Sequence, residues 1–308
     1  MNYLKDYREG EKFVGTYLCK QKQILKTKAG KTYYSLTLQD KTGTADGKIW
    51  ELNNGIANFE PMDYIHCEGM VTSFQGNLQM NISRVRISDE GEYDPADYVP
   101  CTNKDVGEMF SRILKYVASV QNKYLRKILE MYFVENKEFV DAFKKHSAAK
   151  SVHHGFMGGL LEHTLSVTDM CQYFAEHYPM IHRDLLITAA LFHDMGKIQE
   201  ISDFPMNDYT DDGQLLGHIY IGARCMENAA AQIPNFPPKL KNELVHCILA
   251  HHGKMEFGSP KVPAIMEAMA LHMADNADAK LQTLTEVFTQ AGDNMGWLGF
   301  NRMFESNL

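Results

Sequence analysis

The chain has 308 residues, of which 44% are hydrophobic and 23% are charged, and its formal net charge is −8. This composition is typical of globular proteins and excludes a disordered chain, a collagen and a coiled-coil rod. No stretch approaches about 18 consecutive apolar residues, so we expect no membrane-spanning helix. Residues 1–10 lack an apolar leader core and no CxxC pair is present, so we expect a cytoplasmic protein with reduced cysteines.

The first part of the chain is rich in β-branched and aromatic residues in partial alternation, a pattern typical of strands. Turn residues such as Gly and Asp separate the predicted strands, and a short helix is predicted at residues 53–59. The predicted strands span residues 13–18, 33–38, 45–50, 64–72 and 78–87. Five strands with a helical insert after the third have the order of an OB-fold barrel.

Charge is unevenly distributed, since residues 1–50 contain ten Lys or Arg but only five Asp or Glu. OB barrels bind single-stranded nucleic acid through a basic groove and stacking aromatic side chains. We therefore predict that three lysines of the first hairpin bind substrate: Lys22, Lys26 and Lys28. A hairpin whose lysines are merely solvated is an equally good interpretation of the charge. For any single aromatic side chain, a place in the barrel core is favoured over base stacking.

A change of sequence period marks a second domain. Residues 89–101 are acidic, contain prolines and have little apolar content, as expected of a linker. Beyond them, apolar residues recur at three- and four-residue steps, beginning with Val106, Phe110 and Ile113. We therefore predict a multidomain chain: an all-β OB barrel at residues 1–90, a linker at 91–103 and an all-α helical bundle at 104–308.

Histidine and aspartate residues in the helical part form a candidate metal site. Imidazole and carboxylate together suit divalent ions such as Mn, Fe, Co, Ni or Zn. In an adjacent His–Asp pair, the imidazole can bind one ion while the carboxylate bridges two. A lone histidine more often packs in the core or lies on the surface than binds a metal. The complete set of candidate ligands, however, argues against a purely structural role. The candidate ligands are His163, His193, Asp194, His218, His251, His252 and Asp275.

The order of His163, the pair His193 and Asp194, and then Asp275 resembles the HD-domain metal-dependent phosphohydrolases, whose fold is all-α. The three further histidines of the set resemble the branch of that superfamily that holds two metals. The whole chain also resembles the YhaM-type 3′–5′ exoribonucleases, which join an N-terminal OB domain to a C-terminal HD domain. Supporting segments are residues 151–154, 213–219, 252–260 and 267–279.

The resemblance implies a site for two divalent metal ions. The first ion would be bound by His163, His193, Asp194 and Asp275, and the second by Asp194, His218 and one or both of His251 and His252. Two such ions activate water near neutral pH and clamp the attacked phosphodiester. Manganese is the ion expected from the resemblance, with Fe, Co, Ni, Mg and Zn left open.

Four more residues are candidates for contact with the substrate. Lys197 is a candidate catalytic cation beside the phosphate, or alternatively a solvated lysine at a helix end. His153 and His154 can contact the terminal nucleotide or donate a proton to the leaving oxygen, although His154 can equally pack against the glycine turn that follows. Ser259 can donate to a phosphate or sugar, or it can only cap the next helix.

The resemblance implies a metal-dependent 3′–5′ exonuclease that hydrolyses single-stranded RNA to nucleoside monophosphates. Single-stranded DNA as a further substrate and a homo-oligomeric state are left open, and no membrane partner is expected. One alternative is a phosphohydrolase of small nucleotides or cyclic dinucleotides, which would not need a strand-holding barrel. Another is a nucleic-acid-binding protein without catalysis, against which the intact ligand set argues.

Overall fold

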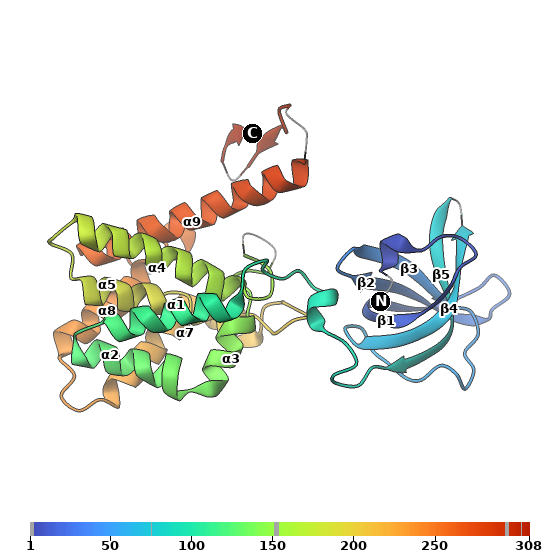
Figure 1. The fold of residues 1–308 in the computed structure, drawn as a ribbon, viewed down its shortest axis with the longest axis horizontal. Helices are drawn as coiled ribbons and strands as arrows, with labels where there is room; N and C mark the ends of the chain where they lie inside the picture. Colours follow the sequence, from blue (N-terminus) through green and yellow to red (C-terminus); the bar gives the residue numbers. More distant parts are fainter. Residues whose placement is uncertain (1–2, 75, 151–153, 293–295, 303) are drawn as a thin grey trace. The chain divides into compact units, whose positions relative to one another are not determined.

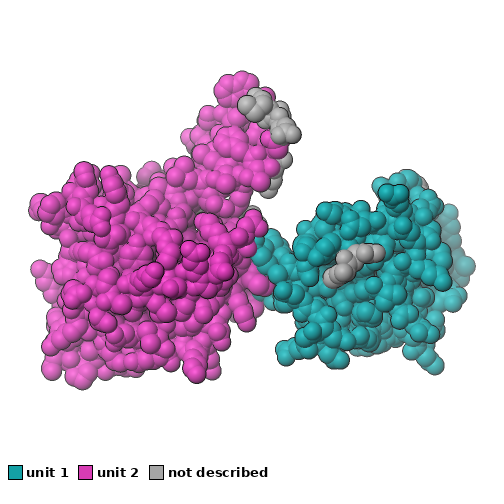
Figure 2. Space-filling view, in the orientation of Figure 1, with its two compact units in different colours: residues 1–101, 204–206 teal, residues 102–203, 207–308 magenta. Residues whose placement is uncertain are grey.

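The computed structural model describes residues 3–74, 76–150, 154–292, 296–302 and 304–308 (Figure 1). The chain forms two compact units, residues 1–101 with 204–206 and residues 102–203 with 207–308 (Figure 2). The first unit is built on strands and the second on helices, so the predicted multidomain architecture is confirmed. None of the described helices is long and apolar enough to cross a membrane.

The first unit is a closed five-stranded barrel in the order β1-β2-β3-β5-β4 (Figure 1). Neighbouring strands are antiparallel, except that β3 and β5 run parallel. β1 is long enough to pair with both β2 and β4, and its register shifts between Cys19 and Gln21. The strands are β1 (Lys12–Lys26), β2 (Thr32–Asp40), β3 (Gly43–Ile49), β4 (Tyr64–Phe74) and β5 (Asn77–Ile87).

The helix predicted at residues 53–59 is wrong, because the segment between β3 and β4 is irregular. The side-chain oxygen of Asn53 accepts a hydrogen bond from the Gly55 backbone, which forms a turn instead of a helical start. The backbone of Gly55 and Ala57 then bonds to Val85 of β5, and Ile56 forms a bridge there. Backbone pairing with the barrel thus satisfies the polar groups that a helix would have satisfied internally.

Residues after β5 stay packed on the barrel. Tyr93 stacks on Tyr64 of β4 with ring centroids 4.0 Å apart, and Tyr98 is only 1% exposed. A short 3-10 helix, η2 (Pro95–Asp97), lies between them, and Lys41 forms an ion pair with Asp97 at 2.7 Å. These contacts explain why the first compact unit extends to Cys101.

The second unit is a helical bundle in which α5 is central. All eight residues from Leu185 to Phe192 are buried, as expected of a helix that is apolar on every side. α4, α8 and α9 pack against it (Figure 1). The helices are α1 (Val106–Ser119), α2 (Lys123–Glu130), α3 (Lys137–Lys145), α4 (Gly159–His177), α5 (Arg183–Phe192), α6 (Lys197–Glu200), α7 (Asp211–Ala231), α8 (Pro238–Ala250) and α9 (Met266–Ala291).

Three short elements complete the described part of this unit. The chain continues from α2 into a π-helical turn, η3 (Met131–Glu135), and a 3-10 turn, η4 (Met255–Phe257), follows α8. A two-stranded hairpin of β6 (Phe300–Asn301) and β7 (Ser306–Asn307) lies beyond α9. The domain predicted as all-α therefore ends in a small β element.

Candidate active site

Five segments of the helical bundle bring all seven predicted ligands together. α4 and α9 contribute them from within a helix, whereas α5 and α8 contribute them from the residues directly after their ends. In α7, Gly217 has a φ of 72° and interrupts the helix immediately before its ligand. The ligands are His163 (α4), His193 and Asp194 (after α5), His218 (α7), His251 and His252 (after α8) and Asp275 (α9).

The first group of ligands surrounds the Nε2 atom of His163. That atom lies 3.1 Å from Nε2 of His193, 3.2 Å from Oδ1 of Asp275 and 3.3 Å from Oδ2 of Asp194. The His163 and His193 side chains are 2% and 0% exposed. Ligand atoms from two helices, α4 and α9, and from the end of α5 therefore converge on one buried point.

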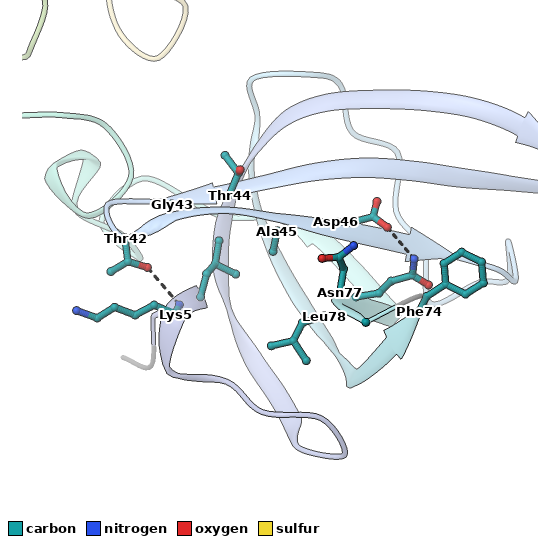
Figure 3. Close-up of a pocket in the computed structure, with 12 residues that line it drawn as sticks. Lys5, Thr42, Gly43, Thr44, Ala45, Asp46, Phe74, Asn77 and Leu78 are labelled. Carbon is teal, nitrogen blue, oxygen red and sulfur yellow. Dashed lines mark hydrogen bonds between the residues drawn. The ribbon is translucent and has the colours of Figure 1, made fainter. Parts of the chain in front are cut away.

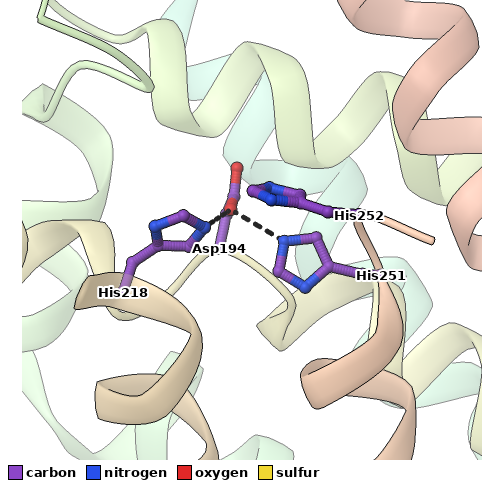
Figure 4. Close-up of side chains that lie close together, drawn as sticks. All are labelled: Asp194, His218, His251 and His252. Carbon is purple, nitrogen blue, oxygen red and sulfur yellow. Dashed lines mark ion pairs between the residues drawn. The ribbon is translucent and has the colours of Figure 1, made fainter. Parts of the chain in front are cut away.

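The second group lies on the other oxygen of Asp194 (Figure 4). Oδ1 of Asp194 is 3.5 Å from Nε2 of His218 and 3.6 Å from Nε2 of His251. His252 completes the group. Its ring centroid lies 4.3 Å from that of His251 and 5.2 Å from that of His218. Asp194 thus directs one oxygen to each group, as a carboxylate that bridges two ions would.

The site contains buried polar atoms that the described residues leave without a hydrogen bond. They include Oδ1 of Asp194 and the Nε2 atoms of His218 and His251, while Oδ2 of Asp194 forms an ion pair with Lys197. Burial of an unpaired polar group costs free energy, and burial of a carboxylate costs more. The imidazole and carboxylate donors suit a borderline divalent cation, which would satisfy these atoms. The residues therefore fit the metal ions that the sequence predicts.

Buried charges move several pKa values at this site. Burial lowers the pKa of His193 to about 4, and burial together with His251 and His218 lowers that of His252 to about 3. Burial opposes charge on Asp194, but Lys197 and the histidines outweigh it and hold its pKa well below the usual range. At neutral pH His193 and His252 are therefore neutral imidazoles and Asp194 is a carboxylate, the forms that bind metal. Burial opposes charge on His163, but Asp194, Asp275 and Asp278 outweigh it and raise the pKa of that ring well above its usual value.

Lys197 begins α6 and extends into the site. Its Nζ atom lies 2.8 Å from Oδ2 of Asp194, and the attraction of that carboxylate raises the lysine pKa although burial opposes it. Gly196 permits this placement, because a Cβ there would lie 2.1 Å from the backbone oxygen of His218. The lysine thus places a cation beside Asp194.

The predicted substrate contacts differ in where they lie. His153 lies outside the described residues. His154 is 2% exposed, its Nε2 atom bonds to Asp278 at 2.9 Å, and its carbonyl packs so closely on Gly159 that a Cβ there would clash. Ser259 is also 2% exposed, and its hydroxyl makes no hydrogen bond to a described residue. Both side chains are therefore held inside the bundle.

Sequence reasoning missed two carboxylates that contact ligands. Asp278 bonds to His163, and Glu200 bonds to His218. Asp278 follows Asp275 by three residues, so helical spacing places both on one face of α9 and offered a signal. Glu200 lies in a different helix from His218 and had no local signal.

On the barrel, the predicted lysines separate into two kinds. The Lys22 side chain is only 8% exposed, and its Nζ atom donates to the backbone oxygen of Phe59 at 2.5 Å. Lys22 therefore does not contribute to an exposed basic surface as the sequence predicted. Lys26 and Lys28, near the turn after β1, are exposed.

One aromatic pair lies on the outside of the barrel. Tyr33 of β2 stacks on Trp50 with ring centroids 4.6 Å apart, and Trp50 is 40% exposed. Its indole N–H donates to Oδ1 of Asn81 at 3.0 Å. The neighbouring Tyr34 instead packs against the buried Phe59, so the two tyrosines face opposite sides as strand alternation requires.

The barrel also has a hollow of about 710 Å³ beside β3 and the turn between β4 and β5 (Figure 3). Its charged lining residues are Lys5 and Asp46, and Asp46 accepts a hydrogen bond from Gln79 at 2.7 Å. Phe74, which is 62% exposed, lies at its edge. The opposite charges give this hollow no positive potential of its own for a phosphate chain.

Comparison with known proteins connects the site to one family. Residues 160–280 match the HD domain family. The 3′–5′ exoribonuclease YhaM of Geobacillus sp. (strain WCH70) is 32% identical over 257 residues, which cover 83% of this chain and 78% of the relative. The YhaM enzymes of Bacillus subtilis (strain 168) and Listeria innocua are also 32% identical, over 83% and 92% of this chain and 81% and 90% of their own lengths.

Among solved structures, the second OB-fold domain of replication protein A from Methanococcus maripaludis matches 30% of this chain and 98% of its own. The sequence identity is 20% and the TM-score is 0.24. The assignment of an OB-type barrel rests on the strand order and the closed sheet described above.

Proposed function

This chain belongs to the YhaM family of 3′–5′ exoribonucleases, and from that membership we propose how its two units degrade RNA. The enzyme is a metal-dependent phosphohydrolase of the HD class, acting on RNA from the 3′ end. The observation that carries the proposal is Asp194, a buried carboxylate with one oxygen directed at each group of histidines. That arrangement suits a bridge between two cations better than any role within the protein alone.

The proposed ligands divide between two divalent ions, with manganese the expected metal. When bound, the ions activate water and neutralise charge at the scissile phosphate. The first ion is assigned to His163, His193, Asp194 and Asp275, and the second to Asp194, His218, His251 and His252. These side chains are largely buried and the Nδ1 atoms of the histidines are hydrogen-bonded, so the protein itself orients the ligands.

Hydrolysis adds one water across the bond between phosphorus and the 3′-oxygen and releases a nucleoside monophosphate. We assign Lys197 to the phosphate: its ammonium lies beside Asp194 and can shift to a non-bridging oxygen as negative charge develops there. Contact of His154 and Ser259 with the terminal nucleotide remains a prediction, because each has an unbonded polar atom but both side chains lie inside the bundle. His153 remains a predicted contact.

The barrel is proposed to hold the single strand before cleavage. Exposed aromatic rings bind bases by stacking, and exposed lysines bind the phosphate backbone. The stacked pair of Tyr33 and Trp50 with the exposed Lys26 and Lys28 supplies both kinds of contact. Lys22 is left out because its ammonium is already bonded inside the barrel.

The test uses a 5′-labelled, unstructured RNA of about thirty nucleotides, longer than the roughly 4–16 nucleotides that one OB fold covers. The protein is incubated with it in Mn²⁺, with EDTA and an Asp194→Ala variant as controls. A ladder that shortens from the 3′ end, absent from both controls, supports the proposal. An absence of cleavage by folded, metal-loaded protein would redirect the search to small nucleotide substrates.

A further inference from the structure

Every histidine ligand is held in the same way by a hydrogen bond to its far nitrogen. In each of the five rings Nδ1 bonds to an oxygen, which leaves Nε2 free to face the site. The bonds are His163 to Asp278 Oδ2 (2.7 Å), His193 to Ala190 O (2.8 Å), His218 to Glu200 Oε1 (2.9 Å), His251 to Ile248 O (2.7 Å) and His252 to Phe257 O (2.8 Å).

Two of these five acceptors are carboxylates, and they are divided between the two groups of ligands. Asp278 holds His163 of the first group, whereas Glu200 holds His218 of the second. A charged acceptor makes a stronger hydrogen bond than a backbone carbonyl and makes the ligand nitrogen more basic. Each proposed metal ion therefore has one histidine ligand whose ring is oriented by a buried acid and whose Nε2 atom is made more basic by it.

We propose that Asp278 and Glu200 are positioning residues, each setting the affinity of a different metal ion. Asp278 acts on the first ion through His163, and Glu200 acts on the second ion through His218. The inference rests on the two-ion site of the proposed function. Neither acid contacts the ions or the substrate in this scheme.

The contacts of Asp278 suit a positioning role better than a ligand role. One of its oxygens accepts from both His163 and His154, at 2.7 and 2.9 Å, and the other accepts from the hydroxyl of Ser166. The residue is 8% exposed, and its oxygens are thus satisfied without a cation. Asp194 shows the opposite condition, because its Oδ1 accepts no hydrogen bond from described residues and its Oδ2 is paired with the Lys197 cation.

Glu200 fixes both the backbone and the ring of His218. Its Oε1 atom accepts from the His218 backbone N–H and from Nδ1, both at 2.9 Å. The backbone N–H is available because Gly217, with its positive φ, breaks the helical hydrogen-bond pattern at this point. One carboxylate oxygen therefore caps the second half of α7 and aims its metal ligand.

The structure provides a matched control for each residue. Glu162 is 7% exposed and next to His163 in the chain, yet it bonds to Thr102 and pairs with Lys104 rather than with an imidazole. Asp169 of α4 accepts from Arg112 and Tyr116. Glu162→Gln and Asp169→Asn thus remove comparable charges without touching a ligand ring.

The experiment titrates full-length, metal-stripped protein with Mn²⁺ and measures the number and affinity of bound ions by electron paramagnetic resonance of free Mn²⁺. Wild type is expected to bind two ions. Glu200→Gln and Asp278→Asn are each expected to lower the affinity for one ion by about 10- to 100-fold and to leave the affinity for the other ion unchanged. Glu162→Gln and Asp169→Asn are expected to match wild type.

A double-mutant cycle identifies which ion each acid controls. In a His218→Ala background, which lacks the second site, Glu200→Gln should change nothing further, whereas Asp278→Asn should still weaken the remaining ion. In a His163→Ala background, which lacks the first site, Asp278→Asn should change nothing further, whereas Glu200→Gln should still weaken binding of the remaining ion. Equal losses in the acid variants and their controls, or losses that persist in the wrong background, would overturn the proposal.

Additional variants show whether a loss of metal affinity comes from misfolding. The wild-type protein shows whether the proposed function or the inference about the two acids has failed. Circular dichroism checks each variant in EDTA, and any amide variant that does not fold is replaced by Asp278→Glu or Glu200→Asp. These keep the charge, so a large loss of affinity in them would count against the inference. Two bound ions without RNA cleavage would refute the proposed function only, and a single bound ion in wild type would refute the inference.

Discussion

In the helical unit, Asp194 is 2% exposed and its Oδ1 accepts no hydrogen bond from described residues, whereas on the barrel Trp50 is 40% exposed and its N–H is bonded to Asn81. The helical site therefore carries an electrostatic cost that a bound cation relieves. On the barrel, the Tyr33 and Trp50 rings are already packed on each other, and we propose that they bind RNA bases by stacking. Changes in the bundle should affect chemistry and stability, and changes on the barrel should affect affinity.

The largest expected effect comes from removing the bridging carboxylate. Asp194→Asn should reduce RNA cleavage by about a thousandfold or more, because both ions lose a charged ligand. RNA affinity, measured by filter binding, should stay close to that of wild type because the barrel is untouched. Asp169→Asn is the matched control in single-turnover cleavage assays. Cleavage within tenfold of wild type would show that Asp194 does not bridge the reacting centre.

Metal removal should destabilise one unit and leave the other unchanged. Each ion present at about 100 times its dissociation constant stabilises the folded state by about 2.7 kcal/mol, and EDTA should remove this stabilisation from the helical unit. The chain has two tryptophans, so Trp297→Phe leaves Trp50 as the only indole reporter of the barrel. Helical unfolding is followed by circular dichroism. A barrel transition that shifts with EDTA would contradict the separation of the two units.

Loss of the exposed indole of Trp50 should weaken binding of single-stranded RNA without slowing hydrolysis. Base stacking on an aromatic ring contributes about 1–3 kcal/mol, so Trp50→Ala should raise KM roughly 5- to 150-fold. At saturating RNA, kcat should be unchanged. Trp297→Ala, at a site 82% exposed on the other unit, is the control. A fall in kcat with constant KM would assign Trp50 a different role.

The exposed barrel lysines should mainly affect how RNA affinity depends on salt concentration. Each phosphate contact on a single strand contributes about 0.7 to the slope of log affinity against log salt concentration. The double variant Lys26→Gln, Lys28→Gln should therefore lower that slope by about 1.4 if both lysines bind phosphate. Lys239→Gln, an exposed lysine of α8, should leave the slope unchanged. Equal slopes for wild type and double variant would favour the solvated-hairpin interpretation.

The smallest effect concerns an exposed ion pair of the barrel. Arg86 donates two hydrogen bonds to Glu92, at 2.6 and 2.9 Å, and lowers its pKa to about 2. The unfolded value is about 4.3, so the stabilisation is complete above that pH and is lost as the pH falls towards about 2. Glu92→Gln should lack this pH dependence in Trp50-monitored unfolding. The difference should be small because water screens exposed pairs.

Local sequence patterns predicted the architecture and singled out the candidate metal ligands. Two-residue alternation predicts the barrel strands and apolar steps of three and four residues predict the helices, because both periods are properties of a single element. The seven ligands stood out because their short contexts are visible within a few residues. The helix predicted at 53–59 failed where a turn at Asn53 and pairing with β5 outweighed local propensity.

Only the tertiary structure decided how side chains from different elements meet. Lys22 looks like a solvated lysine in a basic strand, yet the fold turns its ammonium towards Phe59 inside the barrel. Glu200 and His218 are 18 residues apart, and their bond depends on how α6 packs beside the kink in α7. Such pairings depend on packing between elements distant in the chain, which no local period encodes. Short sequence motifs therefore predicted the candidate metal ligands, whereas packing between helices selected the acids that hold His163 and His218 in place.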